Sequence, residues 1–163
     1  MPYQRHLLSP PVDFLPRQKV IPLPALCNTL VVLNPLLRCT REKSPAIDYD
    51  LYSPPTSARL NPRYWSFCSR NWGEEPAMSP SEIASITIRV HRRGVELNLP
   101  PIVVFPASIH NTTVTIADVL RSVNSCLIRD TRYQSFAEEA RWNGLYASHN
   151  ERDVWILELS AAN

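Results

Sequence analysis

The chain has 163 residues and a mass of 18.6 kDa, which is the size of one domain with some length to spare. It contains 16 prolines but only 3 glycines, and this scarcity of glycine argues against the glycine-rich loops that cradle phosphate groups. A net charge of +2 and an isoelectric point near 8.4 are too mild to indicate a nucleic-acid-binding protein by themselves.

The first 29 residues are rich in proline, which favours extended, polyproline-like backbone. We therefore expect an N-terminal arm over residues 1–29, followed by a single domain over residues 30–163. The start of the chain lacks the short apolar core of a secretory signal, and prolines interrupt the uncharged stretch 20–37, where a membrane-spanning helix would need an unbroken backbone. These features predict an intracellular protein, cytoplasmic or nuclear, with no transmembrane helix and no membrane partner.

An edge strand is predicted where Ile47, Tyr49 and Leu51 alternate with two aspartates. The aspartates point to the same side of such a strand, and consecutive prolines end it. We interpret the two carboxylates as a solvated edge, because metal or acid–base chemistry needs further converging ligands and the sequence nominates none.

The densest aromatic segment spans residues 63–73, with four aromatic rings and two arginines between prolines. Aromatic and arginine side chains anchor protein interfaces and also form stacking platforms for bases. The alternative is that the rings pack as ordinary core over the sheet. The candidate partner-binding residues are therefore Tyr64, Trp65, Phe67 and Trp72.

A second strand is predicted over Ser85–His91, where apolar and polar residues alternate. Residues 95–99 alternate in the same way, and a hairpin in which Gly94 has a positive φ joins the two runs. The apolar run 102–105, bracketed by prolines, predicts a short strand covered on both faces.

The tip of this hairpin gathers basic side chains. Three guanidinium groups there suit contact with phosphate or nucleic acid. The alternative is a solvated basic turn that Glu96, on the opposite strand, partly neutralises. The candidate phosphate-contacting residues are Arg89, His91, Arg92 and Arg93.

Helices are predicted late in the chain, where prolines are absent. An apolar stripe over residues 116–127 follows a capping box of Thr115 and Asp118. A second capping box, Ser135 and Glu138, predicts a shorter helix that stops at Asn143-Gly144. Residues 145–147 and 154–159 predict a closing hairpin, in which one face carries Trp155, Leu157 and Leu159.

The sequence nominates no catalytic, metal-binding or cofactor-binding residue. The four cysteines are isolated from one another and have no histidine at metal-ligand spacing, which argues against zinc and for buried thiols. The four histidines are scattered, and no strained nucleophile turn accompanies them. We therefore expect no cofactor.

Four segments occur in a fixed order: Leu33–Leu37, Ile47–Leu51 with two prolines soon after, Val114–Leu120, and Gly144–Tyr146 leading to Val154–Leu157. Together they resemble a fungal family of unknown function, found mostly in mushroom-forming species, with the ordered signature NPLL, (Y/W)DL..PP, vTv.DVL, GL and W.L. The resemblance spans residues 30–160. It brings no activity, cofactor or partner, because the shared residues are apolar, turn-forming or capping types.

These observations predict an α+β fold, with an antiparallel sheet of four to six strands, two helices packed on one face and a proline-rich arm. The leading functional hypothesis is a non-catalytic protein-interaction or scaffolding module whose partner is another protein. Two alternatives remain open: a nucleic-acid-binding domain that uses the arginine-rich hairpin and the basic arm, and a small-ligand binder or uncharacterised enzyme. The sequence does not predict an oligomeric state.

Overall fold

The computed structural model describes residues 30–39, 44–108, 111–134 and 140–159, so the expected arm over residues 1–29 lies outside the described residues. Four short 3-10 helices occur between the main elements: η1 (Pro35–Leu37), η2 (Pro55–Ser57), η3 (Pro62–Phe67) and η4 (Trp72–Glu74). The helices are α1 (Ile116–Arg129) and α2 (Thr131–Gln134). The strands are β1 (Val32–Leu33), β2 (Ile47–Asp48), β3 (Arg59–Leu60), β4 (Met78–Ser79), β5 (Ile86–Arg92), β6 (Val95–Glu96), β7 (Ile102–Val104), β8 (Leu145–Ala147) and β9 (Val154–Leu159).

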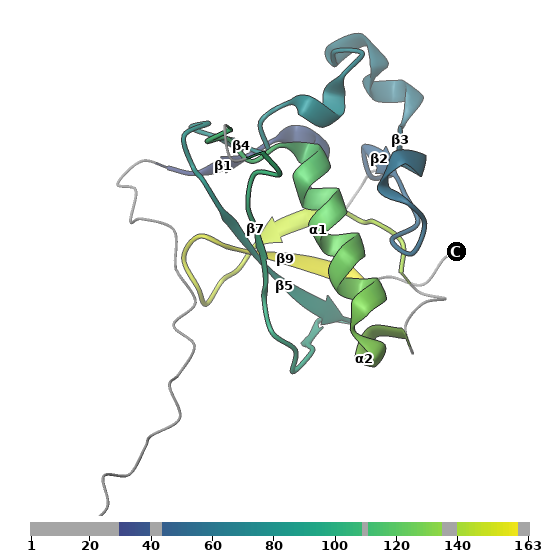
Figure 1. The fold of residues 1–163 in the computed structure, drawn as a ribbon, viewed down its shortest axis with the longest axis vertical. Coiled ribbons are helices and arrows are strands. Elements are labelled where there is room, and N and C mark those ends of the chain that lie inside the picture. Colours follow the sequence, from purple (N-terminus) through teal and green to yellow (C-terminus); the bar gives the residue numbers. More distant parts are fainter. Residues whose placement is uncertain (1–29, 40–43, 109–110, 135–139, 160–163) are drawn as a thin grey trace, which may run out of the picture.

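The main sheet has five strands in the order β6-β5-β9-β8, and β7 also pairs with β5 (Figure 1). The expected mixed α and β fold is confirmed, but the expectation of a wholly antiparallel sheet is wrong, because β5 and β9 pair in parallel. The long connection between them contains α1, and such a crossover brings two strands into the sheet in the same direction. The hairpins β5–β6 and β8–β9 are antiparallel, as predicted.

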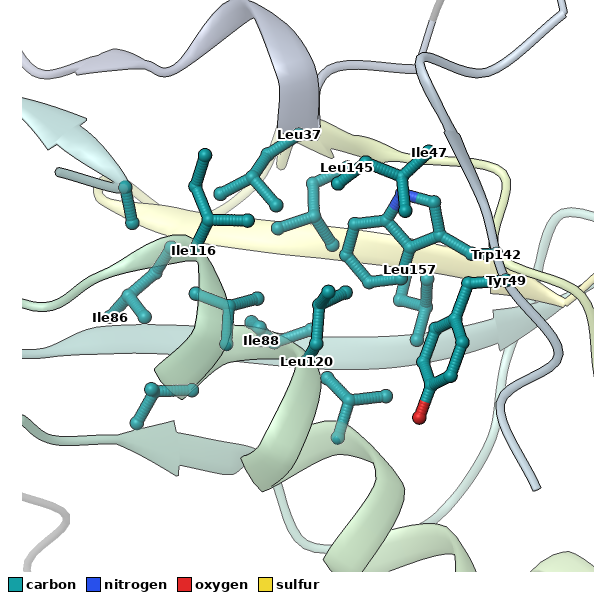
Figure 2. Packing of buried hydrophobic residues seen from close by; sticks show 14 of the residues in the cluster. Leu37, Ile47, Tyr49, Ile86, Ile88, Ile116, Leu120, Trp142, Leu145 and Leu157 are labelled. Carbon is teal, nitrogen blue, oxygen red and sulfur yellow. The ribbon is translucent and has the colours of Figure 1, made fainter. Parts of the chain in front are cut away.

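The central strand β5 follows the predicted alternation only on its inner face. Ile86, Ile88 and Val90 are buried in the main core, together with the fully buried indole of Trp142 (Figure 2). On the outer face Thr87 is also buried, because its neighbour on β9 is the buried Val154. That face is therefore partly apolar, although a wet face was predicted there.

The strand β7 alternates as well, with Ile102 and Val104 buried and Val103 partly exposed. Phe105, which follows it, is 54% exposed. The prediction that this run is covered on both faces is therefore wrong. The strand pairs with β5 at one side of the sheet, and α1 covers one face of it.

The helix α1 begins as predicted, with the Thr115 hydroxyl accepting from the backbone N–H of Asp118 and the Asp118 carboxylate accepting from the N–H of Thr115. One carboxylate oxygen of Asp118 also accepts from Ala107 N and Arg121 Nη1. The predicted apolar stripe faces the core, and the buried Asn124 lies beside it. The capping box therefore both starts the helix and holds the loop that precedes it.

The described residues of the second predicted helix are not helical. The structure places a single helical turn, α2, before Ser135, whereas residues 135–139 lie outside the described residues and residues 140–143 are not helical. Backbone hydrogen bonds of 2.9 Å join Leu51 N to Ala140 O and Trp142 N to Tyr49 O. Residues 140–142 therefore extend beside residues 49–51, and this tertiary pairing overrides the local helix signal.

Gly144 lies where this extended segment meets the first described residues of the chain. Its φ is +87°, and a Cβ added there would lie 2.6 Å from the Arg38 carbonyl carbon and 2.7 Å from its oxygen. The backbone comes this close because Cys39 N donates to Leu145 O, at 2.9 Å. Only glycine fits both the backbone conformation and the close approach.

We predict that Gly144→Ala lowers the free energy of unfolding by about 2–4 kcal/mol, from left-handed backbone strain and from overlap with the Arg38 backbone. Gly94→Ala is the matched control, since Gly94 has a φ of +75° but nothing within 4 Å of an added Cβ. It should cost only the strain, about 1 kcal/mol. Urea unfolding of both variants measures the difference, and equal losses would contradict the close-packing argument.

Candidate protein-interaction groove

The aromatic segment predicted from the sequence forms η3 and η4, the teal segment between β3 and β4 (Figure 1). The Asn61 side chain accepts from Arg63 N at 3.2 Å and caps η3. After η4, the carbonyl of Glu75 accepts from Ile116 N at 3.0 Å, which joins the segment to the start of α1. The segment is thus capped at its start and joined to α1 at its end.

Trp65 is the exposed ring of this segment. Trp65 is 66% exposed, yet its indole Nε1 donates a hydrogen bond to the carbonyl oxygen of Leu60 at 3.1 Å. Tyr64 and Trp72 are only partly exposed and pack against the main core, and Phe67 closes η3, with its side chain outside the described part of the chain. The structure therefore displays Trp65 and uses two of its neighbours for packing.

A groove with a volume of about 980 Å³ opens beside Trp65. Its walls come from the β2–β3 ladder, from η3, from the loop into η4 and from the extended segment 141–143. Trp142, which is 2% exposed, lies at its inner side, and its Nε1 has no hydrogen-bond acceptor among the described residues. The other lining residues are Ser44, Pro45, Asp48, Ala58, Arg59, Leu60, Asn61, Pro62, Cys68, Ser69, Arg70, Trp72, Arg141 and Asn143.

The charges of the groove are mostly positive. Arg59, Arg70 and Arg141 line it, and Asp48 is the acidic residue among the described lining residues. Arg141 Nη1 lies 3.8 Å from Asp48 Oδ1, and both side chains are more than half exposed, so this ion pair is weak. Sequence reasoning missed Arg59, which lies on β3 just before the aromatic segment, and Arg141, which comes from a distant part of the chain.

The thiol at the groove shows no sign of activation as a nucleophile. Burial, and then the nearby Glu75 carboxylate, raise the pKa of Cys68, so it is a thiol at neutral pH. Burial likewise raises the pKa of Cys126, on α1. Within the described ranges, no three His, Cys, Asp or Glu side chains come together as metal ligands, and no helix is both long and apolar enough to cross a membrane.

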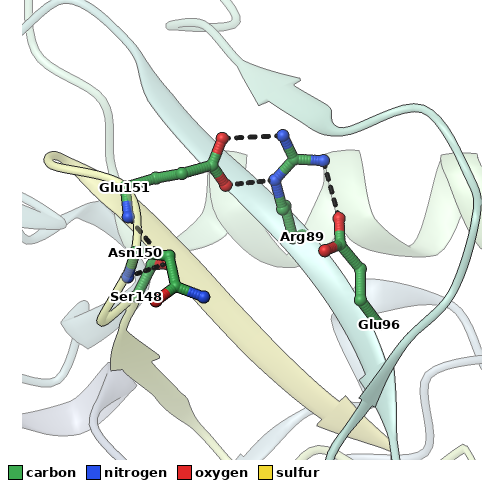
Figure 3. A network of polar contacts seen from close by, with 5 residues as sticks. All are labelled: Arg89, Glu96, Ser148, Asn150 and Glu151. Atoms are coloured by element: carbon green, nitrogen blue, oxygen red, sulfur yellow. Dashed lines mark hydrogen bonds and ion pairs between the residues drawn. The ribbon is translucent and has the colours of Figure 1, made fainter.

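The arginine-rich hairpin has the predicted turn, with Arg93 and Gly94 both at positive φ. Arg89 binds two carboxylates: its Nε and Nη2 donate to Glu151, the latter at 2.7 Å, and its Nη1 donates to Glu96 at 2.8 Å (Figure 3). Glu151 N in turn donates to Ser148 Oγ at 3.2 Å, within the β8–β9 loop. The charge of Arg89 is thus used within the fold, where it fastens this loop to the sheet.

The assignment of Arg89, His91, Arg92 and Arg93 to phosphate contact stays a prediction. The guanidinium of Arg89 is already neutralised by Glu151 and Glu96. The sequence signalled the pairing with Glu96, which lies opposite His91 in the hairpin register. It carried no local signal for Glu151, which comes from the far end of the chain.

We predict that Glu151→Gln lowers the free energy of unfolding at neutral pH, and that the deficit shrinks in acid. The Arg89 guanidinium holds the pKa of Glu151 below its usual range. A carboxyl whose pKa is lower in the folded than in the unfolded chain stabilises the fold above the unfolded value, about 4.3, and this stabilisation disappears as the pH falls through the folded value.

Urea unfolding from neutral pH to about pH 3 tests this prediction. Glu82→Gln is the control, because Glu82 is exposed and makes no ion pair with a described residue. The control should follow the wild type at every pH. A Glu151→Gln deficit that stays constant down to the lowest pH would show that the ion pair does not carry the effect.

Comparison with known proteins gives a family and no activity. The family of unknown function DUF6699 matches residues 47–159, which is more than half of the chain and runs from the start of β2 to the end of β9. The segment Leu33–Leu37 of the expected signature lies before this match. No curated protein and no solved structure matches the chain. The chain therefore belongs to DUF6699, a family of unknown function.

Proposed function

We propose that this protein is a non-catalytic interaction module that binds an extended peptide segment of another protein in the groove beside Trp65. The observation that carries the proposal is the indole of Trp65, which is 66% exposed but held in place by its hydrogen bond to Leu60. A ring that is already oriented loses little conformational entropy on binding. Large, rigid and exposed aromatic side chains are the usual anchors of protein interfaces.

The composition of the groove supports a peptide ligand over a small molecule. Its volume of about 980 Å³ lies at the upper end of small-ligand pockets. However, such pockets bury most of their ligand, whereas exposed charged side chains line this groove. The described lining residues include tryptophan and arginine but no lysine. Protein interfaces are enriched in the first two residue types and depleted in lysine.

The chemistry of the described lining residues supports a non-catalytic role. Asp48 is exposed and paired only weakly, and no histidine lines the groove within the described residues. The raised pKa of Cys68 disfavours the thiolate that a nucleophile needs. A binding role needs none of these groups.

We predict that Trp65→Ala abolishes peptide binding while leaving the fold intact. A display library of random dodecapeptides, panned against the immobilised full chain, should yield sequences that bind the wild type and lose at least about tenfold in affinity for Trp65→Ala, as expected for an aromatic anchor. Because the residue is 66% exposed, the variant should unfold in urea close to the wild type.

The matched control is Phe105→Ala, which removes another exposed ring, 54% exposed, at a position that does not line the groove. Peptides selected on the wild type should bind this variant unchanged. Selected peptides that bind all three proteins equally, or the absence of any enriched sequence, would overturn the proposal.

A further inference from the structure

We propose that the groove selects acidic peptides, with an apolar side chain against Trp65 and carboxylates on Arg59 and Arg70. This inference rests on the proposed function, since it names the class of peptide that the same groove binds. It is carried by the charges that line the groove and by what each of them already contacts.

The groove has an excess of two positive charges among its described residues, from Arg59, Arg70 and Arg141 against Asp48. Asp48 already has cations on two sides. It lies opposite Arg59 in the β2–β3 register, and its Oδ1 is 3.8 Å from Arg141 Nη1. Its negative charge is therefore outweighed by the positive charges around it. A peptide entering the groove meets a positive field.

Arg59 and Arg70 differ from the arginines that the fold uses. Arg89, Arg121 and Arg132 each bind a carboxylate at 2.9 Å or less. By contrast, neither Arg59 nor Arg70 makes an ion pair with any described residue, and both are exposed. A guanidinium presents planar, paired donors that match a carboxylate, so each can bind one aspartate or glutamate of a ligand.

The groove that these arginines line also has an apolar part. Trp65 provides its exposed ring, Leu60 is nearly buried below, and Trp72 is partly exposed. A leucine, proline or aromatic side chain of the ligand would bury apolar area there, and the surrounding arginines would repel lysine or arginine. The expected ligand therefore combines an apolar anchor with nearby acidic residues.

Single-stranded nucleic acid is also anionic and also stacks on aromatic rings, but the groove favours a peptide. Stacking of successive bases needs successive exposed rings. Trp65 is displayed, whereas Trp72 packs on the core and Trp142 is 2% exposed.

The test uses the full chain and the peptides recovered from the display library that depend on Trp65. Their sequences should contain more aspartate and glutamate, and less lysine and arginine, than the unselected library. The most enriched peptide is then synthesised with a fluorescent label, once as selected and once with each Asp and Glu replaced by Asn and Gln. In fluorescence anisotropy the neutral version should bind at least about tenfold more weakly, with the difference shrinking at high salt.

The protein side is tested with the double variant Arg59→Gln and Arg70→Gln, which keeps polar side chains with hydrogen-bond donors and removes two charges. It should weaken binding of the acidic peptide at least about tenfold and leave the neutral peptide unchanged. The control Arg63→Gln with Arg129→Gln makes the same change in net charge with exposed residues that do not line the groove. It should bind the acidic peptide like the wild type, and urea unfolding checks that both doubles are folded.

The outcomes separate the two proposals. The acidic preference is overturned if the Trp65-dependent peptides are neutral or basic. It is also overturned if acidic peptides bind the Arg59→Gln and Arg70→Gln double variant as tightly as the wild type. Either result leaves the proposed interaction module unaffected. Recovery of no Trp65-dependent peptide overturns the proposed function itself. Labelled oligo(dT) is the third probe, and tighter Trp65-dependent binding of this strand than of the acidic peptide would assign the groove to nucleic acid.

Discussion

The short antiparallel pairing between residues 49–51 and 140–142 determines where the groove lies. Its two backbone hydrogen bonds, Leu51 N to Ala140 O and Trp142 N to Tyr49 O, join the proline-rich front of the chain to its C-terminal part. Asn124 strengthens the junction from α1, because its buried amide donates to Leu51 O at 2.7 Å and Ser53 O at 2.9 Å. The Tyr49 hydroxyl donates to the same Ser53 carbonyl at 2.9 Å, and burial, with the Asp50 charge second, raises the Tyr49 pKa to about 12. Without this junction, Asp48 of β2 and Trp142 would not line the same groove.

Those parts of the fold that depend on neighbouring residues could be predicted from the sequence. The capping box at Thr115 and the buried inner face of β5 follow from local patterns, and both are present. The parallel pairing of β5 with β9 could not be predicted, because a strand's pattern does not reveal the direction of its partner. The helix expected up to Asn143 competed with backbone partners on residues 49 and 51, and no local pattern reports such partners.

The candidate site likewise has features that the local sequence predicts and features that depend on the fold. Trp65 could be found from the sequence because aromatic density is a local property, although its exposure, unlike that of Trp72, depends on the fold. The use of an arginine depends on distant residues: Arg89 is bound by Glu151, which is 62 positions away, whereas Arg59 faces the groove with no ion pair among the described residues. In the sequence these two arginines look alike. The difference between a structural cation and one available to a ligand arises only when the chain is folded.

The abundance of proline also affects the structure of the groove. Pro35, Pro55 and Pro62 each begin a 3-10 helix, at the position where the missing N–H of proline costs no hydrogen bond. Pro62 itself lines the groove, and the turn that it starts carries Trp65. Because proline restricts the unfolded chain as well as the folded one, such turns are ordered at a lower entropic cost. A wall that is rigid before the ligand arrives leaves more of the contact energy for affinity. These prolines therefore rigidify the wall of the proposed binding groove around the Trp65 indole.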